Sequence, residues 1–134
     1  MLDPIAKLKE IYAAFGRGDI AYIIASMADD VSWEFEAPPE ISWGGIRRGP
    51  QEALGFFTVI ANEHADPKLE MTEFLASGDA VAAFGRYAAT VRATGVRVDT
   101  PVGHYFKFRD GKIVRYINFV NTGAFVEAAR ARPR

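Results

Sequence analysis

The first half of the chain carries apolar side chains at helical spacing. Between Asp3-Pro4 and Gly16, apolar residues recur every three or four positions, which predicts a helix with one apolar stripe. An acidic residue followed by proline is typical of a helix start, and glycine is typical of a helix end. Asp19 begins a second, shorter helix, and Gly49-Pro50 opens a third that ends before Pro67. Each of these helices has one side to bury.

The rest of the chain alternates between apolar and polar residues, as strands do. Residues 31–36 alternate strictly, which predicts a half-buried strand. The later segments predict four more strands, over 69–75, 81–91, 96–108 and 113–120, and a final helix over 123–130. Pro101 and Gly103 indicate a bend or bulge, and Asp110-Gly111 is a strong hairpin signal. Helices segregated from an antiparallel meander predict an α+β fold, taken as a single domain over 1–134.

Both faces of the last predicted strand are largely apolar. One face carries Ile117 and Phe119, and the other carries Tyr116 and Val120. A sheet with one face in water alternates more cleanly than this. We therefore expect helices on the concave face and a second copy of the chain on the convex face, which predicts a homodimer.

Composition narrows the classes of function. The chain has 134 residues, of which 49% are hydrophobic and 25% charged, with a net charge of −1 and no cysteine. This balance gives no reason to expect nucleic-acid binding, and disulfides and thiolate chemistry are excluded. The sequence shows no signal peptide and no segment apolar enough to span a membrane, so a cytoplasmic protein is expected. No phosphate loop or dinucleotide fingerprint is present, and two distant histidines do not make a metal site, so we expect neither cofactor nor metal.

Four stretches carry a resemblance to a known family: 12–19 (YAAFGRGD), 27–33 (MADDVSW), 48–50 (RGP) and 104–114 (HYFKFRDGKIV). With these stretches the chain resembles the nuclear-transport-factor-2-like superfamily, in its SnoaL-like and ketosteroid-isomerase-like branch. The resemblance implies a cone-shaped, curved and mainly antiparallel sheet around a pocket that the N-terminal helices close. It also implies a dimer formed by the convex sheet faces. Because one fold hosts many functions, the resemblance implies little about the chemistry.

The catalytic groups of similar enzymes are largely missing from this sequence. The general-base aspartate of ketosteroid isomerases falls at Phe35, their oxyanion tyrosine at Ile11 and their oxyanion aspartate near His104. Limonene epoxide hydrolases use an Asp–Arg–Asp set, of which Arg86 matches the arginine. Ala88 and Asn118 stand where the two acids would be. Scytalone-dehydratase-like enzymes use two pocket histidines, but the second histidine here, His64, precedes Pro67 at a helix end and is expected to be exposed.

His104, Arg86 and Asn118 are the candidate catalytic residues. His104 shares a face with Phe106 and has a pKa suited to proton transfer, although a lone histidine on an apolar face is also a common structural residue. Arg86 lies on the same face of its strand as Phe84, and it could hold a carboxylate or enolate, or pair with a nearby acid. Asn118 could orient a ligand carbonyl or only bond to His104 or Arg86. The predicted ligand-binding wall consists of Tyr12, Trp33, Phe35, Phe57, Phe84, Phe106 and Tyr116.

These features leave three functions open. The first is a cofactor-free isomerase, cyclase or lyase that acts on a small hydrophobic carbonyl or polyketide-like compound, with His104 as general acid/base and Arg86 and Asn118 as oxyanion donors. The second is a binding protein without catalysis, which holds an apolar acid by its carboxylate on Arg86. The third is a dimerisation scaffold with a closed core. Trp43, in a glycine-rich loop, is either a lid over the pocket or an exposed side chain without a role.

Overall fold

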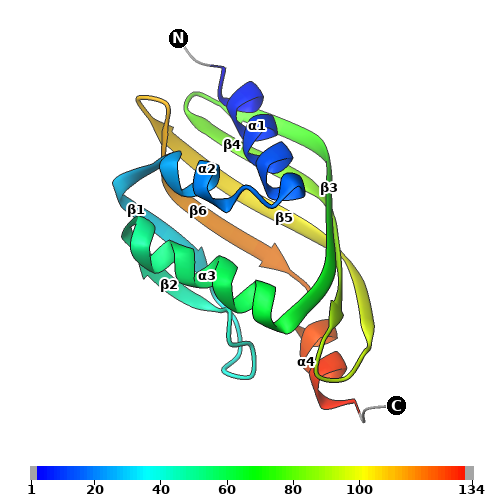
Figure 1. The fold of residues 1–134 in the computed structure, drawn as a ribbon. Coiled ribbons are helices and arrows are strands. Elements are labelled where there is room, and N and C mark those ends of the chain that lie inside the picture. The colour runs from blue at the N-terminus through cyan, green and yellow to red at the C-terminus, as the bar shows by residue number, and fades with distance from the viewer. Residues whose placement is uncertain (1–2, 132–134) are drawn as a thin grey trace.

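The structure is a computed structural model that describes residues 3–131. Four helices and six strands follow one another in these residues (Figure 1). The elements are α1 (Pro4–Arg17), α2 (Ile20–Ala25), β1 (Met27–Phe35), β2 (Gly45–Arg48), α3 (Gly49–Glu63), β3 (His64–Ser77), β4 (Ala80–Val91), β5 (Arg97–Arg109), β6 (Lys112–Val120) and α4 (Thr122–Arg130). No helix in this part of the chain has the length and apolarity needed to cross a membrane.

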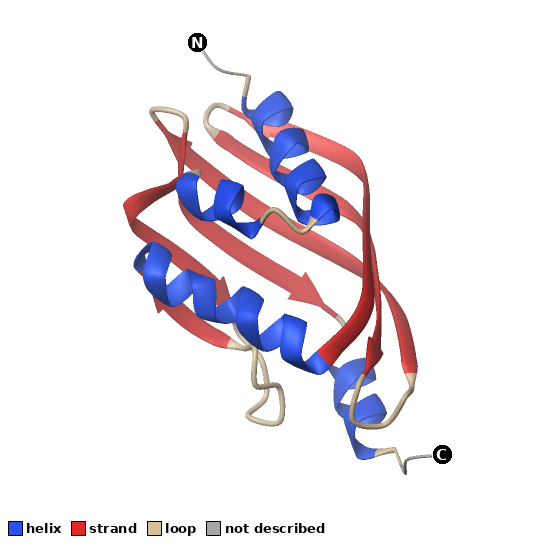
Figure 2. Ribbon diagram, in the orientation of Figure 1, coloured by secondary structure: helices blue, strands red, loops and turns tan. Residues whose placement is uncertain are grey.

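All six strands form one curved sheet in the order β2-β1-β6-β5-β4-β3. The pairing of β1 with β6 is parallel, and every other pairing is antiparallel. Figure 2 shows α1, α2 and α3 together on one face of the sheet, with α4 beyond the far end of the strands. The α+β class and the mainly antiparallel, curved sheet predicted from the sequence are confirmed.

The ends of several elements differ from the sequence prediction. The first strand begins at Met27 rather than Val31, and Gly45–Arg48 forms a short edge strand where a loop was expected. The third strand begins at His64, directly after α3, and so contains Pro67. Proline cannot donate to a ladder, and its position in β3 falls where the register with β4 shifts, between Ala65 and Lys68.

The sheet bends because its outer strands are bulged. A second shift of register in β3 lies between Met71 and Glu73, opposite Gly85 of β4. A Cβ atom at Gly85 would collide with the backbone carbonyl oxygen of Glu70, so only glycine allows β3 to approach this closely. The bend brings β3 over the concave face, where it forms one wall of the enclosed space.

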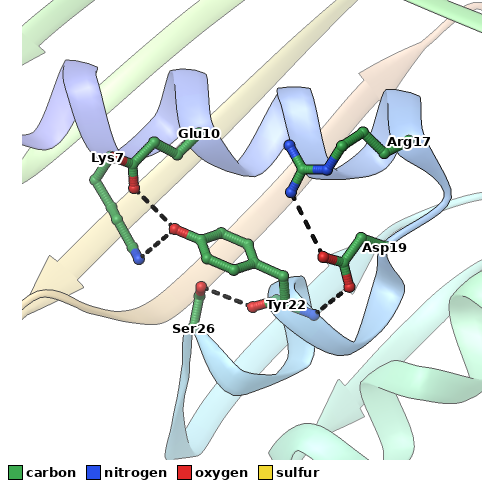
Figure 3. Close-up of polar contacts among 6 residues, drawn as sticks. All are labelled: Lys7, Glu10, Arg17, Asp19, Tyr22 and Ser26. Atoms are coloured by element: carbon green, nitrogen blue, oxygen red, sulfur yellow. Dashed lines mark hydrogen bonds and ion pairs between the residues drawn. The ribbon is translucent and has the colours of Figure 1, made fainter.

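The first two helices are tied together by polar contacts of Tyr22 (Figure 3). The Tyr22 hydroxyl accepts a hydrogen bond from Lys7 Nζ at 3.0 Å and donates one to Glu10 at 2.8 Å. The Asp19 carboxylate caps α2 by accepting from the Tyr22 backbone N–H, and Ser26 Oγ donates to the Tyr22 carbonyl oxygen at 2.8 Å. These contacts fix α1 against α2, while the buried stripe of α1 packs toward the sheet.

Candidate functional site

A cavity lies between the concave face of the sheet and the three N-terminal helices. Its volume is about 60 Å³, counted as space for the centres of water-sized molecules, which is room for roughly four to six waters. The wall is almost entirely apolar and aromatic. The lining residues are Ile11, Tyr12, Phe15, Ile23, Trp33, Trp43, Phe56, Phe57, Ile60, Leu69, Tyr87, Val102, His104, Phe106, Tyr116, Asn118 and Val120.

The main polar contact in the cavity wall joins helix α1 to strand β5. The Tyr12 hydroxyl lies 2.8 Å from Nδ1 of His104, at hydrogen-bond distance. Tyr12 follows the buried Ile11 on α1 and is itself partly buried, whereas His104 is 7% exposed. The bond leaves the other ring nitrogen of His104, Nε2, without a hydrogen bond to any residue between 3 and 131. Because His104 lines the cavity, this nitrogen is available for a hydrogen bond to a ligand there.

Both members of the Tyr12–His104 pair are uncharged at neutral pH. Burial lowers the pKa of His104 to about 3, because the imidazolium would lose its hydration there. The same burial raises the pKa of Tyr12 well above its ordinary value of 10. A neutral imidazole has one donor and one acceptor nitrogen, so the direction of the bond to Tyr12 decides which role Nε2 plays. Nε2 accepts a proton if Nδ1–H donates to Tyr12, and donates if the Tyr12 O–H donates to Nδ1.

Two buried polar atoms near this pair have no partner among the described residues. Asn118, the register neighbour of His104 on β6, has an unpaired Oδ1, and Trp33 has an unpaired Nε1–H. Neither atom bonds to His104 or Arg86. Leaving a buried donor or acceptor unpaired costs about 1–3 kcal/mol. A ligand that supplies one acceptor and one donor here would recover part of that cost.

The aromatic wall is packed around Trp33 and Tyr116. These rings are stacked with centroids 3.8 Å apart and planes 15° apart, and Phe106 meets Tyr116 edge-on at 5.0 Å. Strand register explains the cluster, because Tyr116 pairs with Trp33 on one side and with Phe106 on the other. The predicted wall residues Tyr12, Trp33, Phe57, Phe106 and Tyr116 all line the cavity. Phe35 is 1% exposed but belongs to the packed core beside Trp43 rather than to the lining.

The structure places Arg86 outside the cavity, and the expectation that it faces the pocket is wrong. Its Nε donates to Asp99 Oδ1 at 2.8 Å on the convex face, where both side chains are more than half exposed. Phe84 shares that face and is 45% exposed, so it is not pocket wall either. Alternation along β4 correctly groups Phe84, Arg86 and Ala88, but the inward face is the one that carries Ala83 and Tyr87. Both faces of β4 contain apolar residues, so the pattern alone did not decide between them.

His64 and Trp43 are buried, contrary to the exposure considered from the sequence. His64 is 3% exposed and its Nδ1 lies 2.9 Å from the Tyr87 hydroxyl. It lies inside because β3 begins at this residue, and Phe125 and Trp43 cover its ring. Trp43 is 3% exposed and lines the cavity, so it is neither an exposed side chain nor a surface lid. The sequence analysis did not identify Tyr87, although strand alternation places it on the same face as Ala83.

Among residues 3–131, no carboxylate, arginine or lysine lines the cavity. Within residues 3–131 no group of three or more histidine, aspartate or glutamate side chains is placed to hold a metal ion. A buried anion needs a partner charge or several donors, which this wall does not supply. The site is therefore suited to a neutral ligand with a few oxygen functions on an apolar body.

The fold defines the class of protein as nuclear-transport-factor-2-like. The family model for the SnoaL-like domain matches residues 8–116, and the chain belongs to that family. An NTF2-like protein from Burkholderia thailandensis E264 is 26% identical, with a TM-score of 0.89 over 98% of this chain and 100% of that one. The structure of TerC co-crystallised with polyporic acid is 28% identical, with a TM-score of 0.85 over 96% and 98% of the two chains.

A structure described as a SnoaL-like polyketide cyclase, from Jannaschia sp. CCS1, is 17% identical. Its TM-score of 0.84, over 97% of this chain and 93% of that one, supports the fold. No curated protein sequence matches the chain significantly. The resemblance to the SnoaL-like branch that the sequence motifs indicated is confirmed.

The buried His104 makes the protein's stability depend on pH. Because its pKa is about 3 in the folded state and 6.5 when exposed, the unfolded chain binds a proton that the folded chain does not. Stability is therefore full above pH 6.5 and is lost as the pH falls from 6.5 toward 3. At about 1.36 kcal/mol per pH unit, this group alone should remove about 2 kcal/mol of the free energy of unfolding between pH 7 and pH 5.

His104→Asn tests this prediction, because asparagine leaves a polar partner for Tyr12 but does not titrate. Urea unfolding at pH 7 and pH 5 should show a loss about 2 kcal/mol smaller in the variant than in the original protein. His64 and the carboxylates are present in both proteins and cancel in the comparison. Equal losses in the two proteins would show that His104 is already able to ionise in the fold.

Proposed function

We propose that the protein binds a small, neutral and mainly apolar carbonyl compound in the cavity and moves a proton on it, as a cofactor-free isomerase, cyclase or lyase. The observation that carries this proposal is the neutral Tyr12–His104 pair in an otherwise apolar wall. The low pKa of His104 keeps the imidazole neutral, with a single ring N–H, across the physiological range. Nε2 can accept a proton when that N–H is on Nδ1.

The reaction is a proton abstraction next to the carbonyl group. With Nδ1–H donating to the Tyr12 oxygen, His104 Nε2 takes the proton, the C–H bond breaks, and its electron pair moves into an enolate. The unpaired Trp33 N–H is the donor for the enolate oxygen, whereas the unpaired Oδ1 of Asn118 can only accept a hydrogen bond from a hydroxyl group of the ligand. In an isomerisation, the proton returns from Nε2 to another carbon. In a cyclisation, the enolate carbon attacks a second carbonyl group, whose oxygen takes the proton. In an elimination, the enolate expels a leaving group, which takes the proton. The enolate charge beside the imidazolium offsets the burial that disfavours a charged histidine.

The similarity to TerC supports a small organic ligand, because TerC was co-crystallised with polyporic acid. The position of Arg86 argues against an apolar acid whose carboxylate is held by that side chain, because Arg86 is on the convex face and already paired with Asp99. A neutral ketone or phenol suits the uncharged wall better than an anion. Localisation in the cytoplasm stays a prediction from the sequence.

Two variants separate the roles of His104 and Arg86. In a turnover assay across ketones and polyketide-like substrates, His104→Ala should lower kcat/KM by about two orders of magnitude or more, because the proton acceptor is lost. Arg86→Ala, on the other side of the sheet, should leave kcat/KM within about twofold. Undiminished turnover in His104→Ala would end the assignment of His104 as the base. A large loss in Arg86→Ala would place the chemistry outside the cavity.

Binding without turnover is the second candidate function, and the lack of a strong base in the cavity wall favours it. No carboxylate from the described part of the chain lines the cavity, and an imidazole with a pKa of about 3 is a weak base when no ligand is bound. In this case neutral aromatic ketones would raise the melting temperature, while no substrate would be consumed. His104→Ala would then weaken the stabilisation without any change in a chemical rate.

We also propose that the convex face of the sheet is a homodimer interface. Phe84 and Phe119 are 45% and 59% exposed, and both pair in register with Gly103, which lies between them. Leu75, at 64% exposure, extends the apolar surface along β3. The ion pairs Arg86–Asp99 and Arg115–Glu34 also lie on this face. An apolar centre with charged residues at its edge fits a second copy of the same face.

Phe119→Asp tests the dimer, because it places a charge at the centre of the proposed interface. The unaltered protein should sediment as a dimer at micromolar concentration, and the variant as a monomer. Leu54→Asp is the matched control: Leu54 is 43% exposed but lies on α3, across the molecule from the convex face, and the change should leave the dimer intact. A monomeric unaltered protein at micromolar concentration would contradict the proposal.

A further inference from the structure

A second histidine–tyrosine pair adjoins the cavity. Tyr87 lines the cavity, and its hydroxyl lies 2.9 Å from Nδ1 of His64. His64 is not part of the lining but lies behind Tyr87. Its ring is stacked on Phe125 with centroids 5.2 Å apart and planes 19° apart, and it meets Trp43 edge-on at 5.2 Å. His64 therefore fixes the position of the Tyr87 hydroxyl from the side that faces away from the cavity.

The two pairs lie at different positions along the strands. Ala83 of β4 is the register partner of His104, and Tyr87 lies four residues further along the same strand. Because strands rise about 3.3 Å per residue, the separation between the two positions is roughly 13 Å. The inward position between them on β4 is Gly85, against which the backbone of β3 packs closely. Val102, the register partner of Gly85 on β5, lines the cavity between the two positions.

The Tyr87 hydroxyl keeps hydrogen-bonding capacity for a ligand. A phenol has one donor and two acceptor sites, and within residues 3–131 its bond to His64 is the single hydrogen bond of this hydroxyl. Burial raises the pKa of Tyr87 and lowers that of His64, so the phenol stays protonated and the imidazole neutral. The far end of the cavity is therefore polar but uncharged, like the end at His104.

We infer that Tyr87, positioned by His64, is a second ligand anchor, and that the ligand is an apolar, ring-containing compound with an oxygen function at each end. One oxygen meets the Tyr12–His104 pair and the other meets the Tyr87 hydroxyl, while the apolar body contacts the wall between them, which includes Val102 and Ile60. This inference rests on the proposed function, since it assumes that the cavity binds a small molecule. It adds the class of ligand and the residue that selects it.

Two probes that differ by one hydroxyl group test the second anchor. Isothermal titration calorimetry measures the Kd of 2-naphthol and of 2,6-dihydroxynaphthalene, which share one ring system but carry one and two oxygens. The unaltered protein should bind the diol about tenfold more tightly than 2-naphthol, because one net hydrogen bond, to Tyr87, contributes up to about 1.5 kcal/mol. The two equivalent orientations of the symmetric diol add a further factor of roughly two. Tyr87→Phe should remove this preference and leave the Kd of 2-naphthol within about twofold.

The preference between the probes is a ratio, so a general loss of folded protein does not change it. His64→Leu, which removes the group that positions Tyr87, should cut the preference to less than about threefold, and it serves as the second variant where Tyr87→Phe does not fold. Tyr105→Phe is the matched control, because Tyr105 lies on the outward face of β5 and the change should alter neither Kd.

The outcomes separate the second anchor from the function itself. Binding of both probes to the unaltered protein with no preference, or a preference that survives in Tyr87→Phe, overturns the second anchor and leaves the proposed binding function standing. Binding of neither probe to the unaltered protein overturns the proposed function, and the second anchor with it. The second anchor and the proposed binding function are both supported if the preference for the diol falls in Tyr87→Phe and in His64→Leu but not in Tyr105→Phe.

Discussion

The hydrogen bond between Tyr12 and His104 is the interaction on which the site depends. It joins the helix layer to the centre of the sheet within an apolar wall, where neither group can be hydrated. Each group satisfies one polar atom of the other, and each stays neutral because burial opposes its charge. The bond leaves one imidazole nitrogen to the cavity. The chemistry proposed for the protein follows from that one nitrogen and from the absence of charge around it.

The fold supplies the conditions for this bond. The bulges in β3 and the lack of a side chain at Gly85 let the sheet close over the cavity, and the contacts of Tyr22 hold α1 in place above it. Aromatic stacking of Trp33 on Tyr116 makes this part of the wall apolar. An apolar enclosure of this kind makes an unpaired polar atom costly, which explains why a ligand with matching oxygen functions would bind there.

Much of the fold and part of the site were predictable from the sequence. Helical spacing, strict alternation and four family motifs indicated an α+β cone, and alternation grouped His104 with Phe106 and Asn118 with Tyr116. The prediction for Arg86 and Phe84 failed because both faces of β4 are apolar enough to face inward, and the choice depends on the bend at Gly85. His64 was misplaced because Pro67 normally follows an exposed helix end, whereas here it lies inside a bulged strand. Contacts between Tyr12 and His104, or Tyr87 and His64, depend on tertiary packing that no local pattern encodes.

The most direct test of this account is the titration of the His104 imidazole, followed by the ¹⁵N chemical shifts of its ring nitrogens in the folded protein. The account predicts two distinct shifts of a neutral ring with a single tautomer, unchanged from pH 8 to pH 5, because the pKa of His104 is about 3. A titration with a midpoint near 6.5 would show a solvated, ionisable histidine. It would contradict the neutral, desolvated centre from which the ligand class and the reaction were argued.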